Sequence, residues 1–74
     1  MVIEGIVLAV QTSVDKNGVE RKAVDLEGIQ LAIRDPKVVA PPGRKEIRAT
    51  VYVNWIRSSK GNFCSYELQD WSLL

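Results

Sequence analysis

Apolar and polar residues alternate most regularly between residues 44 and 57. Every second position in this stretch is apolar, at Ile47, Ala49, Val51, Val53 and Trp55. The positions between them are polar or amphipathic, at Arg44, Glu46, Arg48, Thr50, Tyr52 and Asn54. Because successive side chains of a strand point to opposite faces, the alternation predicts a long strand with one face in the core. Trp55 shares the apolar face, so we expect it in the core rather than in contact with a ligand.

The N-terminal residues 2–10 are apolar on both alternating faces, apart from Glu4. Such a strand is covered on both sides, so the pattern predicts either that it curls into a closed barrel or that its outer face contacts another subunit. Gly5 permits the sharp bend that a barrel strand requires. The Asn-Gly dipeptide at residues 17–18 predicts a hairpin turn, because both residues tolerate positive φ, and joins this strand to residues 19–27.

Residues 19–27 fit either a strand or a helix. Their weak alternation of charged and apolar residues suits an exposed strand. A helix is the alternative, since Val19, Ala23 and Leu26 lie at helical spacing and the composition favours it. Gly28 would interrupt that helix after about two and a half turns. We prefer the strand.

Three further segments follow. Residues 29–34 alternate with one polar face and predict a half-buried antiparallel strand. Residues 35–43 contain all three prolines, which block helix and inner-strand pairing, and predict a loop with a short turn from Asp35 to Val38. The stretch SSKGN predicts a turn, after which the chain returns as a last strand.

These elements predict a single all-β domain over residues 1–74, a small five-stranded antiparallel barrel with at most one short helical turn. A chain of 74 residues forms a core that supplies only about 3 to 5 kcal/mol. The single Cys64 cannot form an internal disulfide, and we expect it to behave as a small buried hydrophobic side chain. A homodimer or another homo-oligomer is therefore expected.

The composition argues against catalysis. The chain has no histidine that could activate the Cys64 thiol or act near neutral pH, and no Gly-rich phosphate loop. We expect no enzyme, no metal and no cofactor. The N-terminal segment has no cationic region before its apolar run and is too short to span a bilayer. A cytoplasmic protein without a membrane partner is expected.

The polar face of residues 44–57 offers a candidate binding surface. Arg48, Tyr52 and Asn54 display a cation, an aromatic ring and an amide in a row. Single-stranded nucleic acid is bound by such a mixture, because cations contact phosphates and rings stack on unpaired bases. The alternative is an ordinary solvent-facing strand on which Tyr52 packs against a cross-strand neighbour.

Two further groups could add contacts. Arg57 and Lys60 flank the SSKGN turn, and Phe63 follows it, so cationic and stacking side chains meet at one tip. Arg21 and Lys22 follow the first hairpin and are secondary candidates for phosphate contact. Acidic neighbours partly cancel them, and the net charge of the chain is only +1.

The run VVAPPGRKEIRATVYVNWIRSSKGNFCSYELQDWSL resembles the C-terminal half of the small OB-fold single-stranded DNA-binding proteins of filamentous phages. Ser13, Lys16 and Gly18 are similar to the turn that precedes their DNA-binding strand. The resemblance implies an OB-like barrel, a dimer, cooperative coating of single strands and neither metal nor cofactor.

The sequence departs from that family at one point, because the family carries aromatic residues soon after the first glycine turn. This chain has the residues VERK there. By resemblance, stacking then falls to Tyr52, Phe63, Tyr66 or Trp71.

Our leading hypothesis is binding of single-stranded nucleic acid, with ssDNA favoured over RNA by the resemblance. The alternative is an assembly subunit that oligomerises through the apolar first strand and the C-terminal WSLL, without nucleic acid.

Overall fold

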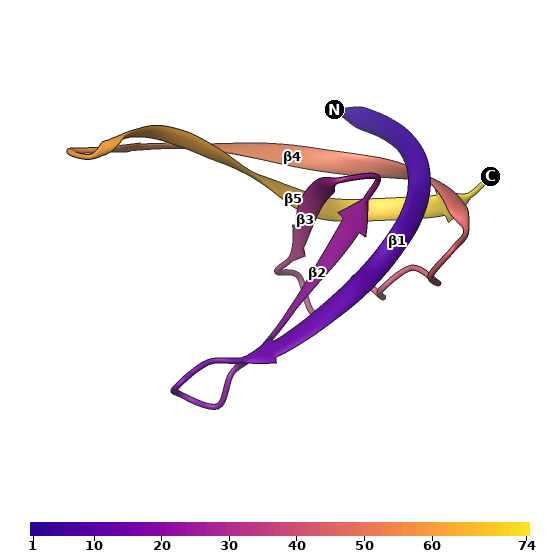
Figure 1. Ribbon diagram of the computed structural model, residues 1–74, viewed down its shortest axis with the longest axis horizontal. Helices are drawn as coiled ribbons and strands as arrows, with labels where there is room; N and C mark the ends of the chain where they lie inside the picture. Colours follow the sequence, from indigo (N-terminus) through magenta and orange to yellow (C-terminus); the bar gives the residue numbers. More distant parts are fainter.

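The computed structural model describes all residues, 1–74, and contains five strands and no helix (Figure 1). The strands are β1 (Val2–Val14), β2 (Glu20–Leu26), β3 (Ile29–Ile33), β4 (Glu46–Ser58) and β5 (Gly61–Leu73). They close into one barrel in the order β1-β2-β3-β5-β4. The prediction of a small all-β, OB-like barrel is confirmed, and the segment that also fitted a helix is strand β2.

Four of the five strand pairings are antiparallel, as predicted, but β3 and β5 are parallel. This parallel seam is short and joins only Leu31 to Tyr66 and Ala32 to Glu67. Alternation in a sequence indicates which face a residue occupies, but it carries no information on the direction of the neighbouring strand. The expectation of a purely antiparallel sheet is corrected in this one pairing.

Strand β1 pairs with two neighbouring strands. Its residues 2–6 pair with β4, and its residues 7–14 pair with β2, with a shift of register between Val7 and Ala9. Figure 1 shows the strand bending through a wide arc between these two parts. Gly5 lies where β1 approaches the β2–β3 turn, since a Cβ there would lie 3.2 Å from Glu27 Oε2 and 3.3 Å from Leu26 Cγ. The bend and the close approach together let one strand close the barrel.

The core is formed by apolar side chains from all five strands. Its buried members are Val7, Val24, Leu26, Leu31, Ile47, Ala49, Val51 and Leu68. The proline-containing loop contributes Val38, which packs against this cluster. The predicted turn is present, because the Val38 amide donates to the Asp35 carbonyl at 3.0 Å. The Trp71 indole N–H donates to the Val39 carbonyl at 2.6 Å and fastens the loop to β5.

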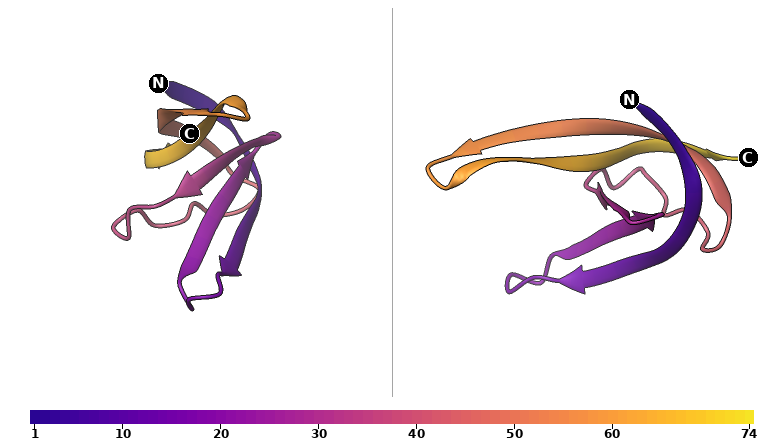
Figure 2. Two further views of the ribbon diagram at one scale, coloured as in Figure 1. Left: turned by 90° about the vertical axis from the view of Figure 1, so that its left-hand side faces the viewer. Right: turned by 45° about the horizontal axis from the view of Figure 1, so that its top comes forward.

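Two arms project from the barrel on the same side (Figures 1 and 2). One is the end of the β1–β2 hairpin. The other is the end of the β4–β5 hairpin, residues 52–65, which lies beyond the last pairs with β1 and β3. The expectation that Trp55 is a core residue is wrong, because the apolar face of β4 continues past the end of the barrel wall. Trp55 is therefore 61% exposed.

The outer face of β1 remains uncovered within one chain. Val2 and Leu8 are 59% and 58% exposed, whereas Val7 on the inner face is fully buried. Of the two alternatives that the apolar pattern allowed, the closed barrel is confirmed. Only ten of the 74 residues are buried, which is a small interior for a folded chain.

Candidate nucleic-acid interface

The seven residues that the sequence singled out do not form one continuous surface. Arg48 lies on the outer face of β4, opposite Glu4 of β1. Its Nε donates to Glu4 Oε2 at 2.7 Å, so the Glu4 carboxylate neutralises the charge of the guanidinium. This pair lies on the β1–β4 side of the barrel and not on the side of the arms.

The β4–β5 arm has two faces of different composition. Residues that pair directly across antiparallel strands share a face, so Tyr52 lies beside Glu67, and Ile56 lies beside Phe63. On the other face, Trp55 pairs with Cys64. Tyr52 and Phe63 are both about half exposed, at 52% and 53%. The predicted aromatic residues therefore lie on a different face from Trp55.

The tip of this arm carries cations without carboxylate partners. Arg57 pairs with Asn62, and Lys60 lies in the turn. The turn is held by the Ser58 hydroxyl, which donates to the Gly61 carbonyl at 3.0 Å and accepts from the Lys60 amide at 3.2 Å. Neither Arg57 nor Lys60 forms an ion pair, so both remain available to an anion.

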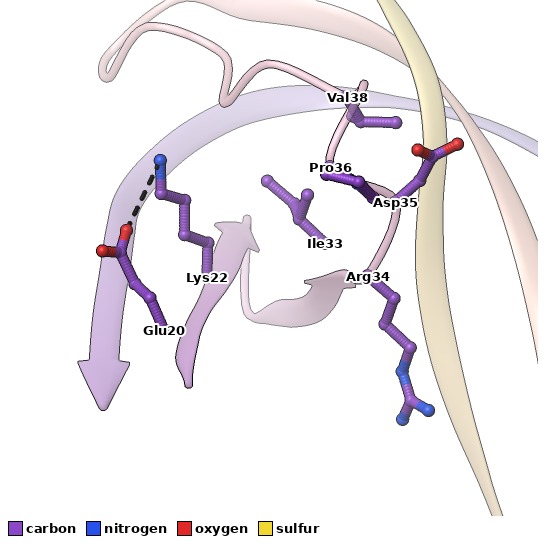
Figure 3. A pocket seen from close by; sticks show the side chains of 7 residues that line it. All are labelled: Glu20, Lys22, Ile33, Arg34, Asp35, Pro36 and Val38. Atoms are coloured by element: carbon purple, nitrogen blue, oxygen red, sulfur yellow. Dashed lines mark ion pairs between the residues drawn. The ribbon is translucent and has the colours of Figure 1, made fainter. Parts of the chain in front are cut away.

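Arg21 and Lys22 point to opposite faces of β2, and each already has a carboxylate partner. Arg21 lies 3.5 Å from Asp15, and Lys22 lies 3.7 Å from Glu20, the pair drawn in Figure 3. Asp15 is fixed by the backbone amides of Asn17 and Val19, which both donate to its Oδ1 at 2.9 Å. The hydrogen bond from Val19 is the main reason that the pKa of Asp15 lies below its usual range.

A second polar surface, which the sequence did not mark as a site, covers the outer face of β1, β2 and β3. The register places Gln11, Ala23 and Ala32 side by side across the three strands. Gln30 Nε2 donates to Gln11 Oε1 at 3.3 Å above this row. Because Ala23 and Ala32 have small side chains, the sheet surface between the amides and the arm is open.

A cavity of about 520 Å³ lies between this surface and β5. Its lining from β2, β3 and their turn is Ala23, Gly28, Ile29, Gln30 and Ala32. Its lining from β5 is Cys64, Ser65 and Tyr66. We call it the neutral slot, since none of these residues is charged. Tyr66, on the same face of β5 as Cys64, pairs with the buried Leu31, so the face of the arm that carries Trp55 continues the core face of the barrel. Glu67 pairs with both Ala32 and Tyr52, so the face of the arm that carries Tyr52 continues the outer face of β2 and β3.

A second groove, of about 300 Å³, adjoins the neutral slot and shares Ala32 with it. Its lining includes Arg21, Lys22 and Arg34 beside a single acid, Glu20. We call it the cationic groove. A third hollow, of about 280 Å³, lies between β2 and the proline-containing loop. Figure 3 shows that the Arg34 guanidinium points away from Lys22 and Ile33 in this hollow. Arg34 has no ion pair and was not among the predicted contacts.

Cys64 and Tyr66 lie at the wall of the neutral slot. Cys64 is half-buried and not fully covered as expected, because β5 leaves the barrel wall at this point. Its Sγ lies 3.7 Å from Tyr66 Oη, and this interaction raises the pKa of the Tyr66 phenol above its usual value. The phenol is neutral at physiological pH, and its ring packs partly against the core beside Leu31.

Other features of the molecule do not point to a different kind of site. No three of its His, Cys, Asp and Glu side chains gather as a metal-binding group. It has no helix of the length and apolar character that a membrane span requires. Comparisons of the chain with protein-family models, with curated proteins and with solved structures found no match.

Proposed function

We propose that this protein binds single-stranded nucleic acid, without catalysis, across the outer face of β2 and β3 and against the β4–β5 arm. The observation that carries the proposal is the adjacency of the neutral slot and the cationic groove. A nucleic-acid strand has the same two components, since uncharged bases alternate in space with negatively charged phosphates. Aromatic rings and cations at neighbouring positions are what single-strand binding requires.

The proposed contacts differ in part from those that the sequence suggested. Arg34, Arg57 and Lys60 contact phosphates first, because no carboxylate neutralises them. Arg21 and Lys22 contribute less, because each must first leave its acidic partner. Stacking comes from Tyr52 and Phe63, which lie on the face of the arm that continues the outer face of β3.

One of the predicted contacts lies elsewhere. Arg48 is bound to Glu4 on the other side of the barrel. It remains a prediction and is secondary in the proposed mode.

The salt dependence of binding tests this proposal. A single-strand contact contributes a slope of about 0.7 to the fall of log affinity with log salt, so three free cations predict a slope of about 2. A labelled oligonucleotide is titrated by fluorescence anisotropy at several salt concentrations, with a duplex of the same sequence as the control. Absence of binding at low salt refutes the proposal, and tighter binding to the duplex refutes its single-strand character.

We propose in addition that the protein acts as a homodimer. The β4–β5 arm is a two-stranded ribbon, a structure that is only marginally stable in water by itself. The face that carries Trp55 also carries Val53, and these two apolar side chains are nevertheless 61% and 38% exposed. A second copy packed on this face would cover the apolar side chains and rigidify the arm. Sedimentation analysis at micromolar concentration checks this, since a monomer under those conditions contradicts it.

A second candidate function is assembly alone, without nucleic acid. The exposed apolar residues Val2 and Leu8 on β1 and Leu73 at the end of β5 favour it. This candidate predicts a stable oligomer that does not bind an oligonucleotide at any salt concentration. The titration described above therefore separates the two candidates.

A further inference from the structure

The neutral slot differs from its surroundings in chemistry as well as in shape. All eight of its lining residues are uncharged, although 26% of the residues of the chain are charged. A cavity of about 520 Å³ falls within the range of small-ligand sites, which is about 300 to 1,000 Å³. A phosphate would gain nothing from such a lining, whereas a neutral planar ring would.

From this we propose that the neutral slot is a nucleobase subsite, which receives one unpaired base while the phosphate of the same nucleotide lies on Arg34. The inference rests on the proposed function and names the part of the strand that each half of the site holds.

The floor of the slot fits a flat ligand. Ala23 and Ala32 pair directly on β2 and β3, and their methyl groups form a low surface between larger neighbours. Ser65 of β5 lines the opposite side, on the same face of the sheet as Ala32. A base that enters from the solvent side can lie flat against the two methyl groups.

The edge of the slot can hydrogen-bond to any base. Gln30 uses one N–H to donate to Gln11, which leaves its carbonyl oxygen and a second N–H free. Ser65 adds a hydroxyl group, which both donates and accepts. Because both groups offer donor and acceptor functions, the subsite accepts purines and pyrimidines without a strong preference.

The spacing to the nearest free cation suits one nucleotide. Ala32 and Arg34 are two residues apart in sequence, and this corresponds to about 7 Å along a strand. The sugar of a nucleotide separates its base from its phosphate by a similar distance. A base over Ala32 therefore places its phosphate within reach of the Arg34 guanidinium, which has no carboxylate partner.

The test fills the neutral slot with a larger side chain and compares the binding of oligonucleotides with and without bases. The variant Ala32→Phe blocks the slot, and Ala23→Leu blocks the same floor from β2 if the first variant does not fold by circular dichroism. Thr50→Phe is the matched control, because Thr50 is exposed on the outer face of β4, away from the slot. The probes are oligothymidylate of about ten nucleotides, within the site size of roughly 4 to 16 for an OB-type barrel, and an abasic strand of equal length.

For oligothymidylate we expect Ala32→Phe to lose about 5- to 150-fold in affinity, which corresponds to the contribution of one bound base. The affinity of Ala32→Phe for the abasic strand should equal that of the wild type. Thr50→Phe should change neither the affinity for oligothymidylate nor that for the abasic strand. An unchanged affinity of Ala32→Phe for oligothymidylate overturns the subsite, and so does an equal loss for both strands. These outcomes leave the proposed function standing. Only a wild-type protein that binds neither strand removes the proposed function, and the subsite falls with it.

Discussion

Replacing Asp15 with asparagine should strengthen the binding of single-stranded nucleic acid and make it more dependent on salt. Arg21 lies 3.5 Å from the Asp15 carboxylate, and its side chain is 67% exposed beside the cationic groove. A phosphate can use Arg21 fully only when this carboxylate no longer competes for it. The asparagine oxygen can still accept the backbone hydrogen bonds from Asn17 and Val19, so the hairpin itself is retained.

The size of the effect follows from the number of contacts. One additional phosphate contact raises the salt slope by about 0.7, from about 2 to about 3. Over a fourfold rise in salt, from about 50 to 200 mM, the variant should therefore lose about 2.6 times more affinity than the wild type does. At the lowest salt concentration it should bind more tightly than the wild type. Fluorescence anisotropy titrations of one labelled oligonucleotide measure both quantities.

The variant Glu4→Gln is the matched control, since it removes one negative charge and releases Arg48 from its partner at 2.7 Å. This ion pair lies on the β1–β4 side, away from the cationic groove. The affinity and the salt slope of Glu4→Gln should stay close to those of the wild type. Equal gains in both variants would show that only the net charge matters. An unchanged slope in Asp15→Asn would show that Arg21 does not contact phosphate, and the reasoning would then fail.

Three other predictions concern stability and pH. Leu31→Ala should cost about 2 to 5 kcal/mol of unfolding free energy, because Leu31 is fully buried; urea denaturation at an unchanged midpoint would contradict its place in the core. Trp55→Ala should change the unfolding free energy, measured in the same way, by no more than about 0.5 kcal/mol, as for an exposed residue; a loss of about 3 to 5 kcal/mol would return Trp55 to the core. The lowered pKa of Asp15 means that its stabilisation of the hairpin is complete above its usual pKa of 3.8 and is lost as the pH falls through the lower value of the folded state. The NMR signal of the Val19 amide should therefore shift only below pH 3.8, and not at all in Asp15→Asn.

The sequence was most informative about properties that depend on near neighbours. Alternation correctly assigned Ile47, Ala49 and Val51 to the core, because Ile47 and Ala49 pair with β1 and the Val51 amide donates to the Met1 carbonyl just before it. The same rule failed at Trp55, since alternation defines a face but does not show where the barrel wall ends. Turn residues predicted both hairpins, because their backbone requirements are local.

The candidate site depended on contacts between distant parts of the chain and was therefore only partly predictable. The polar face that carries Gln30, Ala32 and Arg34 was visible in the alternation of residues 29–34. Its position beside β5 follows from the parallel seam at Leu31 and Tyr66, which no local pattern indicates. The neutralisation of Arg48 by Glu4 likewise depends on the register between strands that lie 44 residues apart.

The long-range pairing of β1 also has a consequence for how the chain folds. The first residues of β1 pair with β4 near residue 50, and the end of β4 nearest the barrel pairs with the last residues of β5. Val7 and its core neighbours can therefore be fully covered only after synthesis of nearly the whole chain. Such non-local pairings slow folding, whereas the two hairpins can form early from local contacts. We expect a nascent chain that ends within β4 to remain open, with its apolar N-terminal strand exposed to chaperones.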